Sequence, residues 1–511
     1  MRRRDFEQLV RDRLALERGR IDKQAPFRVA LTYPSPYRVA MSSLGFQQVY
    51  KQIQLEPGMC CERFFLPEDA GKGFFEDRPL SYESLRPLSD FPVIAMSVAY
   101  ELELGGVVQM LEASGVGALR EERDPRQPLV VCGGPLTFSN PLPLGAFADV
   151  IVMGEADALV AEVMRVIRDA PTKETALADL AQVPHVYVPE AHGDDLPEVA
   201  KCPDELLPAW SPIRTPDTEL SDMFLIEAER GCSRRCTYCV MRRTTNGGMR
   251  LVSKDRLLEL IPEDAKRVGL VGAAVSDHPE VVPLVQALVD RGSEVGLSSL
   301  RPNRLNDPFV EVLKAAGYRT LTTAMDGASQ RMRSVLDRGA KEKHLYAAAE
   351  LTRKHRIARL KLYLMLGVPG ETDADVDECV ETVKELSKIC PIALTIAPFC
   401  AKRNTPLDGQ AYAGIKVVEK RVSRLRRGLK GRADVRATSA RWAWVEYVLA
   451  QGGWPEGHAV YRAVANGGRF ADYRNAFSER AEKTTRRQLY IVRDAPNPHG
   501  RQMHRWMDLA E

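Results

Sequence analysis

Residues 224–239 read FLIEAERGCSRRCTYC, a short apolar run followed at once by Cys232, Cys236 and Cys239. Three thiols so closely spaced on one segment are a metal-binding pattern. A structural zinc site commonly takes a fourth ligand from a second pair of cysteines or histidines. No such pair is near, because the next histidine along the chain is His278. The spacing therefore favours an iron-sulfur cluster with one iron left open to a cofactor or substrate.

The cysteine segment opens a series in which apolar strand candidates alternate with helical stretches. The strand candidates lie at residues 224–231, 267–274, 294–300, 320–325, 359–367 and 392–399. About six such units are too many for a small flavodoxin-like sheet. The series predicts a full or partial β/α barrel over residues 221–415, with its site at the carboxyl ends of the strands.

A second β/α series precedes the cysteines. Its strand candidates are nearly continuous apolar runs, which are typical of parallel strands covered on both faces. They lie at residues 28–37, 91–100, 128–135 and 147–155, with a helical stretch at 105–115. The pattern predicts a doubly wound α/β domain, flavodoxin- or Rossmann-like, over residues 28–184, after a helical extension at residues 1–27. Ligands of such domains bind beyond the carboxyl ends of the strands.

The remaining segments differ in composition. Residues 185–220 are rich in proline and acidic groups, which predicts an extended linker. Residues 416–511 are expected to form a small, mainly helical, basic region, since residues 401–511 hold 22 Lys and Arg against 11 Asp and Glu. Apolar residues recur three or four apart in 416–430, as on one face of an amphipathic helix. We interpret its charges as a solvated face, with a nucleic-acid surface as the alternative.

Composition limits the compartment. The chain has 511 residues, 44 % hydrophobic and 28 % charged, and contains no continuous apolar stretch long enough to span a bilayer. The first twenty residues lack the apolar core of a secretory signal. We expect a cytoplasmic protein without a membrane partner. In that reducing compartment the scattered cysteines are expected to be core thiols. They are Cys60, Cys61, Cys132, Cys202, Cys379, Cys390 and Cys400.

The C-x3-C-x2-C pattern, with an aromatic residue before the last cysteine, resembles the radical S-adenosylmethionine (SAM) superfamily. Three further segments carry the resemblance: SSLR at 298–301, AMDGAS at 324–329 and GVPGET at 367–372. The resemblance implies a 4Fe-4S cluster on the three cysteines and SAM as a second cofactor. The residues implied in SAM binding are Tyr238, Gly272, Ser299, Arg301, Asp326, Gly367 and Pro369.

The resemblance also implies a mechanism. SAM binds the open iron, and a reduced cluster donates one electron to its sulfonium. Methionine and a 5′-deoxyadenosyl radical result, and the radical removes a hydrogen atom from a substrate. The electron would come from a flavodoxin- or ferredoxin-type partner. Two positions depart from the family pattern: residues 272–274 read GAA instead of GGE, and Asp326 stands where glutamate is more common. Gly367 and Pro369 equally suit a strand-to-helix turn.

The amino-terminal half carries a second resemblance. The run YPSPYRVAMSSLGFQ at 33–47, with VCGGP, MGE and APFCAKRNTP farther along, is similar to an uncharacterised radical SAM family with an amino-terminal cobalamin-binding-like domain. The residues implied in cobalamin binding are Ser42, Leu44, Ser97, Gly133, Gly134, Gly154 and Glu155. The DxHxxG motif that supplies an axial histidine is absent. Either cobalamin is bound without that ligand, or the domain is a scaffold or substrate-recognition module.

Three functions follow. The first is a SAM-cleaving enzyme, with cobalamin for methylation or rearrangement of an unreactive carbon. The second is RNA modification of the methylthiotransferase kind, which needs a second cluster on three amino-terminal cysteines, although Cys60 and Cys61 are adjacent. The third is a non-catalytic iron-sulfur or SAM-binding protein. The substrate is left open among small molecule, peptide and RNA. Arg243, Lys361 and Tyr363 are interpreted as structural.

Overall fold

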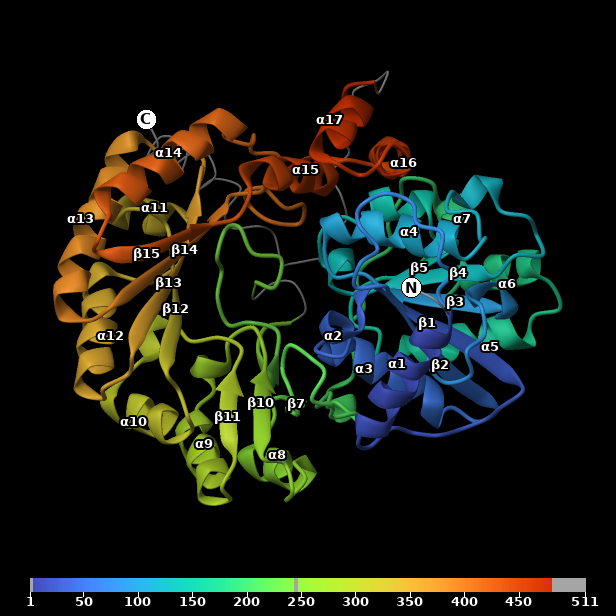
Figure 1. Ribbon diagram of the computed structural model, residues 1–511, viewed down its shortest axis with the longest axis horizontal. Coiled ribbons are helices and arrows are strands. Elements are labelled where there is room, and N and C mark those ends of the chain that lie inside the picture. The colour runs from blue at the N-terminus through green and yellow to red at the C-terminus, as the bar shows by residue number, and fades with distance from the viewer. Residues whose placement is uncertain (1–2, 243–246, 480–511) are drawn as a thin grey trace. The chain divides into compact units, whose positions relative to one another are not determined.

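The structure is a computed structural model that describes residues 3–242 and 247–479. The described residues form two compact units, whose elements are labelled in Figure 1. Unit 1 comprises residues 3–224 and 448–479, and unit 2 comprises residues 225–447. Arg243 and the last part of the expected basic region, residues 480–511, lie outside the described residues.

Unit 1 is built on one six-stranded sheet with the order β2-β1-β3-β4-β5-β6. Neighbouring strands of this sheet pair in parallel, except β5 with β6, which are antiparallel. The strands are β1 (Phe27–Pro36), β2 (Met59–Leu66), β3 (Val93–Ser97), β4 (Leu129–Gly133), β5 (Val150–Val152) and β6 (Val186–Tyr187). The order reverses between β1 and β3, as in doubly wound folds. The predicted fold class of this half is confirmed.

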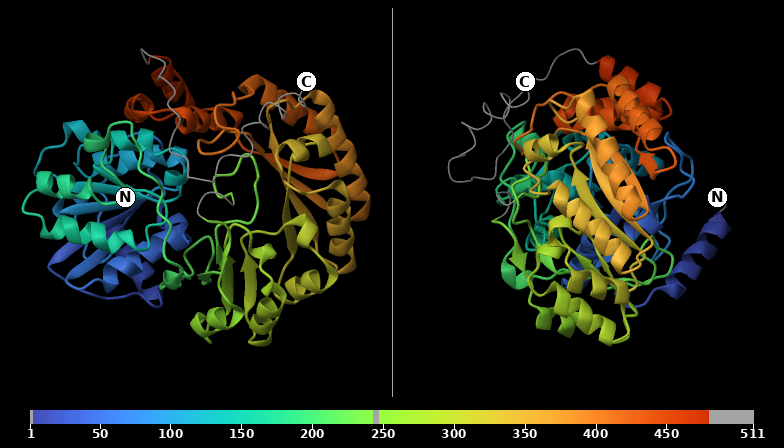
Figure 2. Two further views of the ribbon diagram at one scale, coloured as in Figure 1. Left: turned by 180° about the vertical axis from the view of Figure 1, so that it is seen from behind. Right: turned by 90° about the vertical axis from the view of Figure 1, so that its left-hand side faces the viewer.

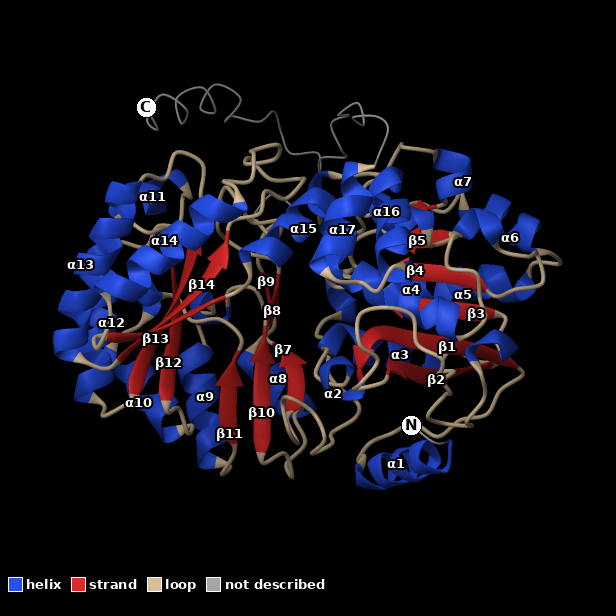
Figure 3. Cartoon of the chain, turned by 45° about the horizontal axis from the view of Figure 1, so that its top comes forward, coloured by secondary structure: helices blue, strands red, loops and turns tan. Residues whose placement is uncertain are grey.

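Helices flank this sheet (Figure 3), and they explain why its strands are apolar throughout. They are α1 (Arg3–Leu16), α2 (Tyr37–Ala40), α3 (Leu44–Leu55), α4 (Leu104–Ala113), α5 (Leu159–Asp169), α6 (Lys173–Leu180), α7 (Pro189–His192), α16 (Trp454–Ala465) and α17 (Phe470–Ser478). Ser43 caps α3 by accepting a hydrogen bond from the Phe46 amide, 3.3 Å away. The expected helical extension at the amino terminus is α1.

The expected linker at 185–220 is instead part of unit 1. Its first residues form β6, and farther on the Ala200 amide donates to the Met153 carbonyl at 2.8 Å. The Ile213 amide donates to Gln47 Oε1 at 3.0 Å. Proline and acidic residues do predict irregular backbone. They do not show whether that backbone hydrogen-bonds to a domain, which depends on partners far along the chain.

Unit 2 carries the strands that follow the cysteine segment. They are β7 (Phe224–Glu227), β8 (Glu229–Arg230), β9 (Arg250–Leu251), β10 (Arg267–Val271), β11 (Glu294–Leu297), β12 (Thr320–Asp326), β13 (Arg359–Leu366), β14 (Ile392–Pro398) and β15 (Ala433–Ala437). They form a sheet β11-β10-β7, a sheet β12-β13-β14-β15 and a small pair β8-β9. Two separate sheets with parallel strands correspond to the predicted partial β/α barrel.

The helices of unit 2 lie between these strands along the chain (Figure 2). They are α8 (Lys254–Leu260), α9 (Val281–Asp290), α10 (Asp307–Ala315), α11 (Gln330–Val335), α12 (Glu342–Lys354), α13 (Asp373–Ile389) and α14 (Ile415–Gly428), with α15 (Ala440–Gln451) at the boundary with unit 1. None of the described helices has both the length and the apolar content needed to cross a membrane.

The expected domain boundary at residue 415 does not coincide with the division of the structure. β15 pairs with β14 and so extends the sheet of unit 2. α16 and α17 belong to unit 1, where the Asn140 side-chain amide donates to the Leu449, Ala450 and Gly452 carbonyls at 3.0, 3.2 and 2.9 Å. These long-range pairings leave no local sign in the sequence.

The amphipathic helix predicted at 416–430 is confirmed as α14. Its apolar stripe, Val418, Val422, Leu425 and Leu429, is buried. Part of its basic face is neutralised by the first turns of α13: Lys420 pairs with Asp373 at 3.1 Å, and Arg424 pairs with Asp377 at 2.6 Å. These ion pairs account for part of the charge of this face, and its interpretation as a solvated face stays a prediction.

Candidate functional site

The cysteine segment forms a loop at the carboxyl end of β7. Cys232 and Cys236 are buried, with exposed fractions of 6 % and 4 %, and Cys239 is half-buried. The Thr237 amide and hydroxyl donate to the carbonyls of Leu336 and Val335 at 3.1 and 3.2 Å, so the segment after β12 anchors the loop. The backbone thus fixes the positions of the three thiols.

Two arginines point at two of the thiols, and of these Arg301 is buried and Arg338 is half-buried. Arg301 Nη2 lies 3.2 Å from Cys232 Sγ, and Arg338 Nη1 lies 3.9 Å from Cys236 Sγ. Arg301 follows β11 and also pairs with Asp277, 3.4 Å away. A guanidinium beside a thiol stabilises the thiolate, which is the form that binds metal. Burial raises the pKa of the Cys236 thiol, and Arg338 opposes that rise.

Asp326 links the end of β12 to the cysteine loop. Its carboxylate forms a close ion pair with Arg338 and a hydrogen bond with Tyr238. Burial raises the pKa of Asp326, while Arg338 opposes that rise. Its backbone has a φ of +60°, a conformation that costs energy in a non-glycine residue and is often found at functional sites. The predicted residues Tyr238 and Asp326 thus meet next to Cys236.

The loop after β10 carries the sequence GAA where the family has GGE. Ser298 accepts a hydrogen bond from the Gly272 amide at 3.0 Å, and Ser299 accepts one from the Val275 amide at 2.9 Å. The Ala274 amide donates to Glu229 Oε1 at 2.6 Å. A Cβ added at Gly272 would lie 2.2 Å from that same oxygen. Glycine is therefore required there because a carboxylate occupies the space.

Glu229 was missed by sequence reasoning. Its side chain is fully buried, and burial raises its pKa to about 7. Its Oε2 atom has no hydrogen-bond partner among the described residues. Glu229 comes from β8, three residues before Cys232, and supports the loop that lacks its own glutamate. Only the position of Glu229 directly before the cysteines was a signal, and one sequence does not show what it faces.

Gly367 and Pro369 form the turn between β13 and α13. Gly367 has a φ of +82°, and its amide donates to Glu371 Oε1 at 2.9 Å. Arg421 donates to the same oxygen at 2.7 Å, and Thr372 caps α13 through Asp375. Burial raises the pKa of Glu371 to about 7. The turn alternative for this segment is thus supported, and its contact with SAM stays a prediction.

The fit to a 4Fe-4S cluster follows from these contacts. Among the residues that the structure describes, no three His, Cys, Asp or Glu side chains gather as one metal ion requires. A cubane cluster needs a wider arrangement, because each thiolate binds a different iron. Three thiols on one anchored loop, two of them facing guanidinium groups, suit that arrangement.

The residues implied in cobalamin binding lie in unit 1. At several of them the chain's own backbone occupies the space that a ligand would need. A Cβ at Gly154 would lie 2.7 Å from the backbone of Ala200, and one at Gly134 would lie 2.6 Å from the Val98 carbonyl oxygen. Glu155 accepts a hydrogen bond from the Cys202 amide at 2.9 Å. The β5 end therefore does not fit a nucleotide tail. Ser42, Leu44, Ser97 and Gly133 are half-buried.

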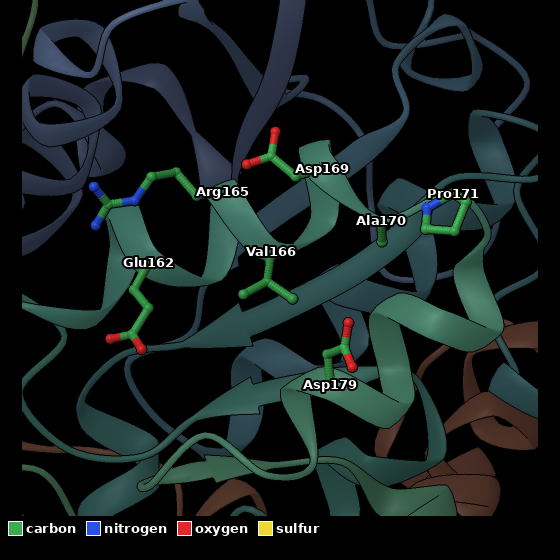
Figure 4. A pocket seen from close by; sticks show the side chains of 7 residues that line it. All are labelled: Glu162, Arg165, Val166, Asp169, Ala170, Pro171 and Asp179. Carbon is green, nitrogen blue, oxygen red and sulfur yellow. The ribbon is translucent and has the colours of Figure 1, made fainter.

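A hollow in unit 1 lies on a helix surface (Figure 4). It measures about 360 Å³ and lies between α5, from Glu162 to Asp169, and Asp179 of α6. Asp169 and Asp179 face it from these two helices. It brings together no group that suggests chemistry.

Comparison with known families identifies both halves. The family described as "Radical SAM superfamily" matches residues 226–383, and the family described as "Radical SAM proteins, N-terminal" matches residues 45–189. Together the two matches cover more than half of the chain. The chain belongs to the radical SAM superfamily. This family implies a 4Fe-4S cluster and SAM as cofactors, which the cysteine loop and its arginines fit.

Relatives of this radical SAM protein differ in how much of its chain they match. An uncharacterised protein of Methanocaldococcus jannaschii is 25 % identical over 408 residues, which is 77 % of this chain and 82 % of that protein. A tRNA-2-methylthio-N(6)-dimethylallyladenosine synthase of Aquifex aeolicus is 23 % identical over 203 residues, 37 % of this chain and 46 % of the synthase. The chain thus spans less than half of the synthase.

Among solved structures, the cobalamin-dependent SAM radical enzyme OxsB, with aqua-cobalamin and SAM bound, is similar with a TM-score of 0.47 and 12 % identity. The similarity covers 79 % of this chain and 56 % of OxsB. The chain therefore spans little more than half of that enzyme.

Proposed function

We propose that this radical SAM protein reductively cleaves SAM at one 4Fe-4S cluster held by Cys232, Cys236 and Cys239. The observation that carries the proposal is the pair of arginines, buried Arg301 and half-buried Arg338, that face two of these thiols. When bound, the cluster supplies an electron to the SAM sulfonium, and SAM supplies a deoxyadenosyl radical that removes hydrogen from a substrate. The electron donor is a flavodoxin- or ferredoxin-type protein, and the compartment is reducing, in keeping with ten free cysteines.

The chain's own residues hold and shield the reacting groups. Arg301 and Arg338 offset the negative charge that accumulates on the thiolates. Asp326 fixes Arg338, and Tyr238 fixes Asp326. Glu229 positions the loop at Gly272, which would help to hold SAM when the cofactor is bound. These are positioning roles, because each acts through a neighbouring group.

An apolar cluster beside the loop excludes water. Tyr238 packs against buried side chains from α11 and from the turns after β13 and β14. They are Met332, Val335, Leu336, Val368, Phe399 and Ala401. Water exclusion strengthens the electrostatic interactions within the site and protects a radical from side reactions. This environment suits chemistry that must not reach solvent.

The methylthiotransferase alternative needs a second cluster, and the positions of the amino-terminal thiols speak against it. Cys60 and Cys61 are adjacent in β2, so their side chains point to opposite faces of the sheet. Cys132 is in β4, which is three strand spacings or about 14 Å from β2. All three are buried, and burial raises their pKa values. These thiols are core residues of unit 1.

We also propose that the chain uses cobalamin to methylate or rearrange an unreactive carbon of the substrate. Its support is the doubly wound order of unit 1, with half-buried Ser97 and Gly133 at the ends of the neighbouring strands β3 and β4. Cobalamin absorbance retained after incubation and desalting would support it. If the chain retains no cobalamin, unit 1 is a scaffold or a substrate-recognition domain. The proposed cleavage of SAM does not depend on whether cobalamin binds.

The test is reductive SAM cleavage. The chain is reconstituted with iron and sulfide without oxygen, reduced with dithionite and given SAM, and 5′-deoxyadenosine is measured by mass spectrometry. We expect release from the wild type and from Cys390→Ala, a buried thiol elsewhere in unit 2, and none from Cys236→Ala. A fully loaded cluster that yields no deoxyadenosine, with or without candidate substrates, would favour the non-catalytic alternative.

A further inference from the structure

The inner face of the sheet β12-β13-β14-β15 is open. Along β13 the side chains alternate: Leu360, Leu362, Leu364 and Leu366 are buried, whereas Arg359 and Tyr363 are exposed and Lys361 and Met365 are half-buried. Figure 1 shows α12 and α13 on the outer side of these strands, where the leucines pack. The other set therefore faces the interior of the partial barrel.

Side chains of a closed β/α barrel fill its interior, so interior residues of such a barrel are buried. Here Tyr363 is 43 % exposed, and Ala397, at the same level as Met365 on β14, is exposed as well. The interior of unit 2 is thus accessible from solvent at the middle of β13.

Lys361 is the cation in this interior. Its Nζ donates to the Tyr363 hydroxyl at 3.1 Å and lies 4.8 Å from the centre of the Tyr363 ring. Within the described part of the chain, no carboxylate forms an ion pair with Lys361. An inward-facing ammonium with only a phenol as partner leaves donors and charge available for an anion.

The neighbouring positions add hydroxyl groups and little negative charge. Register places Thr322 and Ala393 beside Lys361, and Ala324 and Thr395 beside Tyr363. On β15, Asp434 is paired with Arg436 at 3.1 Å, so it does not compensate Lys361. Arg359 adds a second exposed cation on the same face of β13. The face is therefore net positive and offers hydroxyl donors.

The pair also lies below the cysteine loop. Tyr363 precedes Met365 by two residues, about 7 Å along the strand. Met365 and Tyr238 pack against the same apolar cluster. A molecule bound at Lys361 and Tyr363 would extend toward the strand ends where the loop with Cys236 lies.

We propose that Lys361 and Tyr363 bind the anionic group of the substrate, a phosphate or a carboxylate of a small organic molecule. The proposal rests on the proposed function, because it takes the strand ends of unit 2 as the reaction site. Lys361 supplies the positive charge, and Tyr363 orients the Lys361 ammonium. A hydroxyl of Thr322 or Thr395 donates a further hydrogen bond to the anion. These two residues, interpreted as structural from the sequence, thereby define the substrate class.

The test is equilibrium dialysis of the full-length reconstituted chain with radiolabelled inorganic phosphate and, separately, with labelled succinate. We expect one of the two probes to bind at about one per chain, which identifies the source of the anion. Lys361→Met should weaken that binding at least tenfold. Lys361→Arg should retain most of it, and the surface variant Lys384→Met should match the wild type. Thermal unfolding checks that each variant is folded.

Two results would overturn the proposal: no binding of either probe to the wild type, or equal binding by Lys361→Met and the wild type. Formation of 5′-deoxyadenosine in the absence of substrate separates this proposal from the proposed function. The surface variant Lys384→Met should cleave SAM at the wild-type rate without substrate, and a wild type that cleaves SAM but binds neither probe leaves the proposed function standing. A wild type that binds the anion but never cleaves SAM would contradict the proposed function only.

Discussion

The strand ends of unit 1 and unit 2 are made of similar loops, and they differ in what those loops contact. In unit 1 the positive-φ glycines Gly134 and Gly154 lie against the backbone of Val98 and Ala200. In unit 2 the loops present arginines to thiols, and the strand beside them exposes Tyr363. A glycine at a strand end permits a close approach, but it does not tell whether a ligand or the chain itself makes that approach.

The largest expected effect comes from removing the cation at Cys236. Arg338→Met leaves the buried Asp326 carboxylate without its partner and the thiolate without its neutralising charge. We expect formation of 5′-deoxyadenosine to fall by about 100-fold or more, since breaking a buried ion pair costs several kcal/mol. The control is Arg353→Met, an exposed arginine on α12. A rate within threefold of the wild type would show that the charge on the thiol does not matter.

A smaller effect tests whether the chain's own backbone closes the β5 end of unit 1. Gly154→Ala combines a left-handed backbone with a clash against Ala200, so unfolding should become easier by about 3 kcal/mol. Gly115→Ala shares the positive φ but meets open space, and should cost only about 1 kcal/mol. Chemical denaturation measures both. Equal losses would mean that residues 199–202 do not press on Gly154, and that this edge is open to a ligand after all.

The smallest effect concerns a buried acid at the β3 end of unit 1. Burial raises the pKa of Glu103 from 4.5 to about 7, although the Ala99 amide donates to it at 2.5 Å. Because the folded state holds this proton to higher pH than the unfolded state, stability should fall as pH rises from about 4.5 to about 7. Relative to Glu103→Gln, the wild type should lose about 2 kcal/mol between pH 5 and pH 8. Parallel pH profiles of the two proteins would contradict this.

Local patterns in the sequence predicted the features that depend on local spacing. The cysteine spacing located the site, alternating apolar segments indicated both sheets, and the apolar stripe at Val418 and Leu425 predicted α14. β2 was missed because Glu62 and Arg63 interrupt the apolar run of MCCERFFL, although the whole strand is buried. Arg338 was missed because 102 residues separate it from Cys236. This contact forms only when distant segments fold together. The same holds for the packing of α16 and α17 in unit 1.

The most direct test of the account is the iron and acid-labile sulfide content of the chain after anaerobic reconstitution, measured for the wild type and for the triple variant Cys232→Ala, Cys236→Ala, Cys239→Ala. The account predicts about four irons per chain in the wild type and almost none in the triple variant. About eight irons in the wild type, or four retained by the triple variant, would place a cluster on the thiols of unit 1 and contradict the assignment of one cluster to unit 2.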